Sequence, residues 1–326
     1  MTITEIAELA GVSIATVSRV YNKKNLHMVS ASTRARVEKI LEEYSYNPDA
    51  NARRLITGRS RLIGFQVPSI RTPIVHSASL EEIARQARMN GYGILVDFPG
   101  DDDFSHPNAE EDGIRYMLDQ GAEGLIWQPR RLPSDKIMAI IHEHKAKVLW
   151  FRPNIPVDGI SVKLDEEKVG ELAAQYLLSC GLKRFYAFVD RTGERFDGFR
   201  RVILEAGFPE PERLEMRAYT QDTIPDRVFS IIDSGAGIFS YFARFASVLD
   251  NLRVQKGLED CQICSYGDEL ISKEYGVRFP VISSNADEIG YHAFHTMQAL
   301  IEGEECSSVQ VKPKLLLWND AVKHLG

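Results

Sequence analysis

Cysteines are few in this chain of 326 residues, and long apolar runs are absent. Four cysteines in a chain of this length indicate a reducing compartment. Cys261 and Cys264 have the spacing of a redox or metal pair, but no second pair or nearby histidine completes a site, so they are predicted to be buried strand cysteines. No apolar run reaches about 18 residues, and the N-terminus lacks the regions of a secretion signal. We therefore expect a cytoplasmic protein with no membrane span, metal or cofactor.

Several enzyme signatures are also missing. The chain has no Gly-x-x-x-x-Gly-Lys phosphate loop, no Gly-x-Ser-x-Gly nucleophile elbow and no His-Glu-x-x-His zinc motif. His142 and His144 would lie about 200° apart on a helix, so they would not converge on one metal ion. We therefore expect a binding protein rather than an enzyme.

The charge is divided unevenly along the chain. The net charge of −7 by itself argues weakly against a nucleic-acid partner. Residues 1–60, however, contain nine Lys and Arg and six Asp and Glu, a balance of +3, while the remaining residues contain 30 and 40, a balance of −10. A basic head on an acidic body is expected where only one part of a protein contacts phosphate.

The first twenty residues have the pattern of two short helices joined by a tight turn. Spacings of three and four put Ile6, Leu9 and Ala10 on one face of the first helix. Gly11 supplies a left-handed turn that ends it, and Ser13 caps the second helix. The buried face of that second helix would consist of Val17 and Val20. Two helices joined in this way predict a helix-turn-helix, in which the second helix enters the DNA major groove.

A third helix and a short polar segment follow. Residues 30–44 form an amphipathic helical pattern whose apolar stripe is Val37, Ile40, Leu41 and Tyr44. Pro48 then suits the first turn of another short helix, and Gly58 ends it. Such a short helix is unstable alone, so residues 47–60 are predicted to be a linker that orders only when something packs on it.

Beyond residue 61, short apolar runs alternate with amphipathic segments. This alternation favours a parallel β-sheet covered by helices on both faces. It restarts near residue 160, which predicts two α/β units and a ligand cleft beyond the carboxyl ends of their strands. The predicted strands are 62–68, 91–96, 124–127, 147–151, 160–162, 185–189, 237–240 and 262–266. The predicted helices are 79–90, 110–120, 134–144, 166–179, 196–206, 223–233, one ending at Arg253, and 286–301.

Many residues of the head, and fewer of the body, follow the pattern of one family. In the head these are Glu5-Ile6-Ala7, Ala10-Gly11-Val12-Ser13, Thr16-Val17-Ser18-Arg19-Val20, Asn22, Val29-Ser30, Thr33-Arg34, Val37, Tyr46-Asn47-Pro48, Ala52-Arg53, Leu55, Gly58 and Ile63-Gly64. In the body they are Asp165, Gly170, Gly181, Arg195, Gly198-Phe199, Asp268 and Gly290. With these residues the chain resembles the lactose/galactose repressor (LacI/GalR) family of bacterial transcription regulators.

The resemblance implies an α/β protein of three parts. These are an all-α helix-turn-helix domain at 1–46, a hinge helix at 47–60, and an effector-binding and dimerisation domain at 61–326. The last part would contain two doubly wound parallel-sheet lobes of the periplasmic-binding-protein type, with three crossovers. The N-lobe would comprise about 61–160 and 287–310, and the C-lobe about 161–286 and 311–326.

The resemblance also implies which residues contact DNA. Readout would begin at Ile14 and Ala15, whose apolar side chains suit a thymine methyl, and Arg19 would contact guanine or phosphate. Leu55 matches the hinge-helix wedge that enters the minor groove. The predicted contacts are Thr4, Ser13, Ile14, Ala15, Thr16, Ser18, Arg19, Asn22, His27, Ser30, Thr33, Asn47, Ala52, Arg53 and Leu55.

A second set of matched residues implies an effector site. Arg195 and Asp268 correspond to family residues that bind ligand hydroxyls or polar edges. The other predicted effector contacts are Val75, Phe151 and Phe242. The chain departs from the family pattern at Phe242-Ala243, where many members have Asn-Asp, at Thr72-Pro73-Ile74-Val75, and around Trp318-Asn319. A glycoside, a sugar acid and a non-sugar ligand therefore all remain open.

These implications predict a transcriptional repressor. It would bind a pseudo-palindromic DNA operator as a homodimer, under allosteric control by a small, sugar-like molecule. A regulator with a non-sugar effector, or with none, is the alternative; a solute-binding protein is disfavoured by the head. The sequence does not identify the effector, the operator or the sign of the response.

Overall fold

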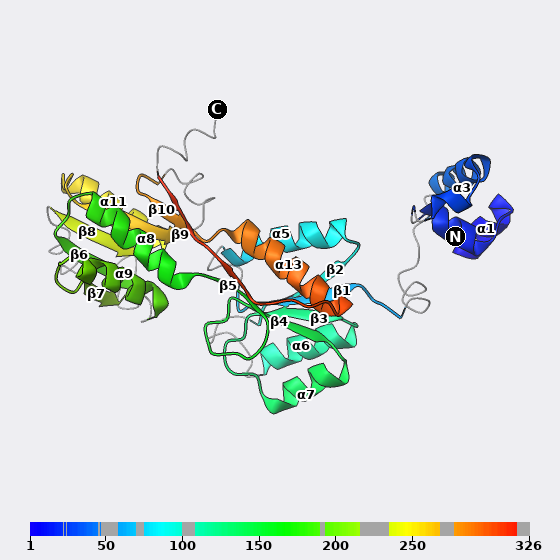
Figure 1. Cartoon of the computed structure of the whole chain (residues 1–326), viewed down its shortest axis with the longest axis horizontal. Helices are drawn as coiled ribbons and strands as arrows, with labels where there is room; N and C mark the ends of the chain where they lie inside the picture. The colour runs from blue at the N-terminus through cyan, green and yellow to red at the C-terminus, as the bar shows by residue number, and fades with distance from the viewer. Residues whose placement is uncertain are drawn as a thin grey trace. The chain divides into compact units, whose positions relative to one another are not determined.

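A computed structural model gives the structure of the protein in two units. It describes residues 1–21, 23, 25–44, 46, 58–69, 75–99, 108–189, 193–215, 235–267 and 277–317. The chain divides into a small unit, Met1–Arg61, and a large unit, Leu62–Gly326 (Figure 1). The helix predicted at 223–233 and almost all of the predicted hinge helix lie outside the described residues.

The small unit consists of short helices. They are α1 (Ile3–Ala10), α2 (Ile14–Tyr21), the 3₁₀ helix η1 (Leu26–Met28) and α3 (Ala31–Glu43). Thr2 and Glu5 form a reciprocal capping box at the start of α1, and Gly11 ends that helix with a φ of 58°. Ser30 caps α3 by accepting a hydrogen bond from the backbone N–H of Thr33. The predicted helices of the head are confirmed.

The core of the small unit differs from the predicted one in two places. Its buried members are Ile6, Ala7, Ala10, Val17, Val20 and Val37. Leu9 was predicted to share one face of α1 with Ile6 and Ala10 but is 53% exposed, and Ala7 is buried with them instead. Tyr44, at the end of α3, is also exposed, and Tyr46 packs against the core in its place.

The first sheet of the large unit has six parallel strands. They are β1 (Leu62–Gln66), β2 (Gly93–Asp97), β3 (Gly124–Trp127), β4 (Lys147–Phe151), β5 (Ser161–Leu164) and β11 (Val309–Val311), in the order β11-β5-β4-β3-β1-β2. Figure 1 shows helices on both sides of this sheet. The pair on one side is α5 (Val75–Met89) and α13 (Ala286–Glu302), and the pair on the other is α6 (Ala109–Asp119) and α7 (Asp135–Glu143).

The second sheet is also mostly parallel. Its strands are β6 (Arg184–Val189), β7 (Glu212–Glu215), β8 (Ala236–Ser240), β9 (Gln262–Gly267), β10 (Val281–Ser283) and β12 (Lys314–Leu316), in the order β12-β10-β9-β8-β6-β7. Only the short β12 pairs antiparallel, with β10. The accompanying helices are α8 (Glu166–Ser179), α9 (Glu194–Glu205) and α11 (Ala243–Gln255).

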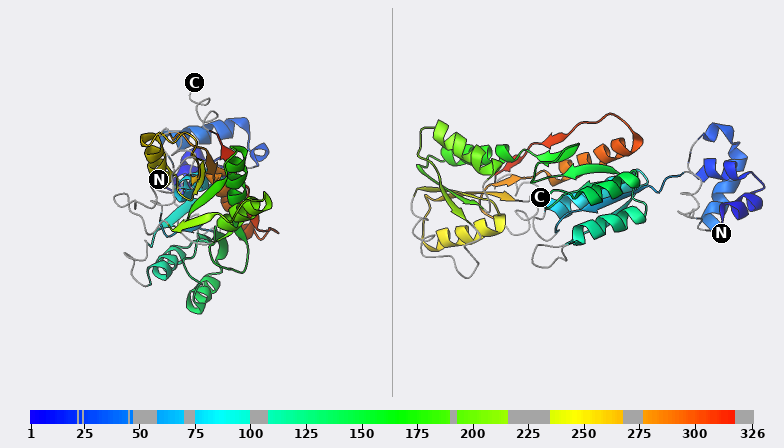
Figure 2. Two further views of the ribbon diagram at one scale, coloured as in Figure 1. Left: turned by 90° about the vertical axis from the view of Figure 1, so that its left-hand side faces the viewer. Right: turned by 90° about the horizontal axis from the view of Figure 1, so that it is seen from below.

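Three chain segments pass between the two sheets. They join β5 to α8, β10 to α13, and β11 to β12. The last of these, drawn in red, can be followed from one sheet to the other in Figures 1 and 2. The predicted fold class, a helical head followed by two α/β lobes with three crossovers, is confirmed for the described residues.

One boundary between the lobes needs correction. The second lobe was predicted to begin at about residue 161, but β5 pairs with β4 and with β11 inside the first sheet. The first crossover therefore follows Leu164. The apolar run at 160–162 predicts a strand but carries no information about which sheet it joins, because its partner β11 lies more than 140 residues further along the chain.

Candidate DNA-reading helix and effector site

The second helix of the head presents its first turn to solvent. The Ser13 hydroxyl accepts a hydrogen bond from the backbone N–H of Thr16 at 3.2 Å, which caps α2 as predicted. Val17 is completely buried beneath the helix. Ile14 is 46% exposed, and Ala15 is exposed beside it. This arrangement leaves the side chains at the N-terminal end of α2 available to a groove of DNA.

The remaining predicted DNA contacts in the described part of the head lie on or near its surface. Thr4, His27 and Ser30 are exposed, and Thr33, Ser18 and Arg19 are half-buried. Ser30 and Thr33 are engaged with each other, since their hydroxyl oxygens are 2.8 Å apart in the cap of α3. Five predicted contacts lie outside the described residues: Asn22, Asn47, Ala52, Arg53 and Leu55.

Five polar side chains meet where the chain passes between the sheets of the large unit. This group, which we call the crossover cluster, consists of Arg152, Glu166, Arg195, Tyr241 and Tyr266. Arg152 directly follows β4 of the first sheet, while Tyr266 lies in β9 of the second. Because one of its arginines comes from each lobe, the crossover cluster links the two lobes.

Two arginines share one carboxylate in this cluster. Nη2 of Arg152 lies 3.1 Å from Oε1 of Glu166 and donates a hydrogen bond of 2.9 Å to the Tyr266 hydroxyl. The other oxygen of Glu166 accepts a hydrogen bond from Nε of Arg195. The Arg195 guanidinium lies over the Tyr266 ring, 3.8 Å from its centroid, and 5.4 Å from the centroid of Tyr241.

Close packing of α8 against α9 sets the position of Glu166 and Arg195. A Cβ atom at Gly170 would lie 1.8 Å from the Arg195 carbonyl oxygen, and one at Gly198 would lie 2.2 Å from the Glu167 carbonyl oxygen. Only glycine permits the two helices to approach this closely. The family pattern at these two glycines therefore has a packing reason.

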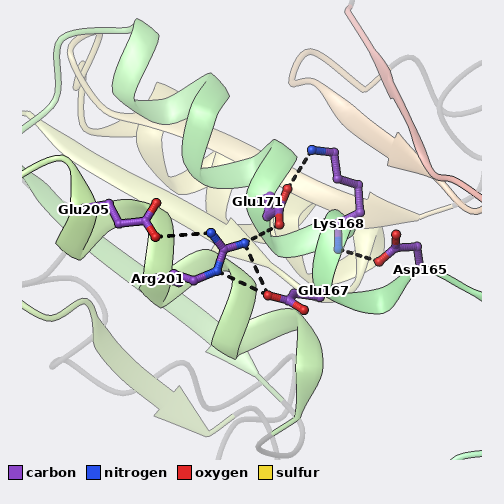
Figure 3. Close-up of polar contacts among 6 residues, drawn as sticks. All are labelled: Asp165, Glu167, Lys168, Glu171, Arg201 and Glu205. Carbon is purple, nitrogen blue, oxygen red and sulfur yellow. Dashed lines mark hydrogen bonds and ion pairs between the residues drawn. The ribbon is translucent and has the colours of Figure 1, made fainter.

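An ion-pair network on the surface joins the same two helices. Figure 3 shows Arg201 of α9 between Glu167 and Glu171 of α8, with Glu205 on its other side. Lys168 also pairs with Glu171, at 2.6 Å. These groups are largely exposed, so each pair contributes little to stability. The glycine contacts, rather than the ion pairs, fix the separation of the helices.

The charges of the crossover cluster stabilise one another. Burial raises the pKa of Glu166, but Arg195 and Arg152 outweigh this effect and hold the pKa below its ordinary value. Burial lowers the pKa of Arg195, yet Glu166 and Tyr266 raise it above its usual range. Burial also raises the pKa of Tyr241, so its hydroxyl keeps its proton at neutral pH. The cluster thus holds two cations and one anion, together with the protonated Tyr241 hydroxyl.

The predicted effector residues are not all found together. Arg195 is central to the cluster, and Phe242, which is 37% exposed, directly follows Tyr241. Phe151 is completely buried in the first lobe, with its ring centroid 5.4 Å from that of Phe65, so in this structure it has no surface to offer a ligand. Asp268 and the side chain of Val75 lie outside the described part of the chain.

Four members of the crossover cluster were not predicted from the sequence. They are Arg152, Glu166, Tyr241 and Tyr266. A usable signal existed, because Arg152 and Tyr241 each come directly after a predicted strand, where ligand-binding side chains of parallel sheets are expected. Glu166 has no distinguishing signal in the sequence, because an acidic residue in the first turn of a helix is common.

Other predictions concern cysteines, metals and membranes. Cys261 and Cys264 are completely buried, as predicted, but only Cys264 lies in a strand, β9, which Cys261 directly precedes. Among the residues that the structure describes, no cluster of three or more His, Cys, Asp or Glu side chains could hold a metal ion. The described helices also include none with the length and apolar character needed to cross a membrane.

Known relatives resemble the chain along most of its length. The family model described as "Bacterial regulatory proteins, lacI family" matches residues 2–49. The HTH-type transcriptional regulator DegA of Bacillus subtilis (strain 168) is 25% identical over 311 residues, 90% of each chain. The HTH-type transcriptional repressor PurR of Vibrio parahaemolyticus is 24% identical over 339 residues, 99% of each chain.

Solved structures share the fold. A lac repressor dimer bound to operator and the anti-inducer ONPF gives a TM-score of 0.72 at 19% identity and 97% coverage of both chains. The transcriptional regulator CelR–cellobiose complex gives a TM-score of 0.64 at 18% identity, over 97% of this chain and 98% of the other. A helix-turn-helix head with a two-lobed α/β body defines a DNA-binding transcriptional regulator. Its head matches the lacI family model, and the whole chain is similar to regulators of the LacI/GalR family.

Proposed function

We propose that the chain is a repressor that binds a pseudo-palindromic operator as a homodimer. A small molecule would raise or lower its affinity for that operator. The observation that carries the DNA-binding part is the exposed first turn of α2 on a well-packed helical head. Relatives named as repressors, and a lac repressor dimer of the same fold bound to operator, support the proposal. A chain of this kind would act in the cytoplasm.

DNA readout would be divided between two parts of the chain. Ile14 and Ala15 suit apolar contact with thymine methyl groups, and Arg19 suits a bidentate contact with guanine. Leu55 of the proposed hinge, residues 47–60, would act as the minor-groove wedge, whose unstacking cost is offset by the contacts that a bent duplex permits. The helix-turn-helix domain, residues 1–46, would then orient this wedge.

Effector control would act through the crossover cluster. Glu166 and Arg195 belong to the second lobe, whereas Arg152 follows the first sheet, so a ligand that competes for these groups changes how the lobes meet. The N-lobe would pass this change to the hinge helices of the dimer. Because the coupling is an equilibrium property, ligand and operator must alter each other's affinity by one factor.

A regulator with a non-sugar effector is the second candidate. It is favoured by Phe242, which stands at the N-terminal end of α11 with 37% of its surface exposed, where many family members carry a polar residue. In a regulator without any effector, the crossover cluster would serve only to join the two lobes.

Selection from a random DNA library tests the proposal. The purified chain should enrich a sequence with two related half-sites whose centres lie about one helical turn, roughly 34 Å, apart. The complex should contain two copies of the chain, as measured by light scattering. Enrichment of single, unpaired half-sites bound by one copy would contradict the dimeric repressor.

A further inference from the structure

Four buried polar atoms in the described part of the large unit have no hydrogen-bond partner. They are Oε1 of Gln66, Oε1 of Gln128, Nη1 of Arg152 and the hydroxyl of Tyr241. All four side chains stand at the carboxyl ends of strands: Gln66 ends β1, and the others directly follow β3, β4 and β8. A buried polar group without a partner costs about 1–3 kcal/mol. Their concentration at the strand ends, where such sheets bind ligands, therefore points to a ligand as the partner.

Among these residues, Arg152 indicates most directly which chemical group the ligand carries. Its side chain is only 7% exposed, and its Nη2 already serves Glu166 and the Tyr266 hydroxyl. Nη1, on the same guanidinium, carries two further N–H donors and is buried without an acceptor. A buried cationic donor is satisfied best by an anionic oxygen, which forms a charge-assisted hydrogen bond.

The charge of the crossover cluster sets the charge of the ligand group. Its described members include two arginines, Arg152 and Arg195, and one carboxylate, Glu166. One additional carboxylate would balance the cluster, whereas a phosphoryl group, with about −1.5 to −2 charges at neutral pH, would overbalance it. The Tyr241 hydroxyl, which has no partner and adjoins Arg195, supplies another donor for that carboxylate.

The first lobe also supplies a hydrogen-bond acceptor for the ligand. Nε2 of Gln128 donates a hydrogen bond of 2.9 Å to the backbone carbonyl of Arg152, which holds the Gln128 amide at the strand end that Arg152 follows. The amide oxygen of Gln128 is buried and free to accept a hydrogen bond. A ligand hydroxyl is a suitable donor to that oxygen.

We propose that the effector is a sugar acid, a polyhydroxy compound whose carboxylate binds Arg152 and Tyr241 and whose hydroxyl binds Gln128. The inference rests on the proposed function, because it names the chemical class of the ligand that controls the regulator. It removes a neutral glycoside and an apolar non-sugar ligand from the alternatives that the sequence leaves open.

Matched pairs of acids and neutral polyols test the inference on the full-length chain. Titration calorimetry and thermal shift would compare D-glucuronate with D-glucose, D-galacturonate with D-galactose, and D-gluconate with D-sorbitol, with glucose 6-phosphate as the phosphoryl probe. We expect at least one acid to bind roughly 10- to 100-fold more tightly than its neutral partner and than the phosphate, the range expected for a charge-assisted hydrogen bond.

Substitutions separate recognition of the carboxylate from a structural role. Arg152→Met should reduce the affinity for the acid to that for its neutral partner, because it removes the cation and leaves Glu166 paired with Arg195. Gln128→Met should lower the affinity for the acid and the affinity for the neutral polyol by the same factor. Arg200→Met is the matched control, since Arg200 is an exposed α9 residue paired with Glu210.

Several results would overturn the inference. Tighter binding of a neutral polyol or of glucose 6-phosphate would show that the effector is not a sugar acid. Unchanged affinity for the acid in Arg152→Met would show the same. Neither result would contradict a regulator controlled by an effector. If none of the seven compounds binds, the inference that the effector is a sugar acid is overturned as well. Failure of the proposed function is seen separately, as the absence of an enriched operator in the DNA selection.

Discussion

At the scale of single residues, Gly170 and Gly198 decide how closely α8 approaches α9 and hence where Arg195 lies. A methyl group at Gly170 would meet the Arg195 backbone at 1.8 Å, a contact that only a shift of the helix relieves. Gly170→Ala is therefore expected to lower the free energy of unfolding by about 1–3 kcal/mol, despite the better helix propensity of alanine. Chemical denaturation measures this change.

The matched control lies in the same helix. Gln175 is on the exposed side of α8, so Gln175→Ala should leave the free energy of unfolding within about 0.5 kcal/mol of the parent. Equal stability of the Gly170→Ala and Gln175→Ala variants would show that the two helices are not held at the separation described.

A second residue-scale prediction concerns pH. Burial is the main cause that lowers the pKa of His76 to about 4, with Arg152 adding to it and the hydrogen bond to the Ser69 carbonyl opposing it. The unfolded chain therefore takes up this proton near pH 6.5, before the folded chain does. Stability from the neutral imidazole should be complete above about pH 6.5 and fall by about 3 kcal/mol as the pH decreases to about 4.

Denaturation as a function of pH checks this expectation. His76→Gln should flatten the decline in stability between pH 6.5 and 4, whatever its effect at neutral pH. His27→Gln, at an exposed position of the head, should leave the decline unchanged. A decline of the same slope in His76→Gln would assign the pH dependence to other groups.

At the scale of elements, the start of α2 combines a structural cap with a DNA-facing surface, and two substitutions of Ser13 separate these roles. Ser13→Ala removes the acceptor for the Thr16 N–H and should destabilise the chain's head by about 1 kcal/mol. Ser13→Asp keeps a capping oxygen, so stability should be retained, but its negative charge should repel phosphate and weaken DNA binding.

Circular dichroism melting and DNA titration together measure the two effects. Full DNA affinity in the Ser13→Asp variant would show that the first turn of α2 does not approach the DNA backbone.

Periodic helices and apolar strands could be predicted from the sequence, and short strands without an apolar run could not. The helix predicted at 166–179 is α8, and the predicted strands at 124–127 and 147–151 are β3 and β4. The strands β7, β10, β11 and β12 were not predicted, since none of these segments of three or four residues is a continuous apolar run like that of β3. Such segments become strands because a neighbouring strand offers hydrogen bonds, which is information that the local sequence does not contain.

At the scale of the whole molecule, the regulator is expected to couple two binding events. By linkage, a ligand that changes operator affinity by some factor must have its own affinity changed by that factor. Leu55→Ala should weaken operator binding and leave ligand binding to the isolated protein intact, because it removes only the proposed wedge. Arg195→Ala should abolish the ligand response and leave operator binding in place.

Fluorescence titrations with DNA and with the ligand measure both affinities for each variant. Unchanged operator affinity in Leu55→Ala would remove the wedge from the mechanism. Retained ligand affinity in Arg195→Ala would remove Arg195 from the effector site.

The sequence by itself determined the helix-turn-helix, the order of most helices and strands, and the resemblance to one family, because these depend on local spacing and on residues close together in the chain. Ser13, Gly11 and Val17 act within one or two helical turns, so their roles could be predicted. Only the tertiary structure placed β5 in the first sheet and brought Arg152 to Glu166 and Tyr266. Arg152 and Tyr266 are 114 residues apart, and their contact depends on both lobes being folded and joined.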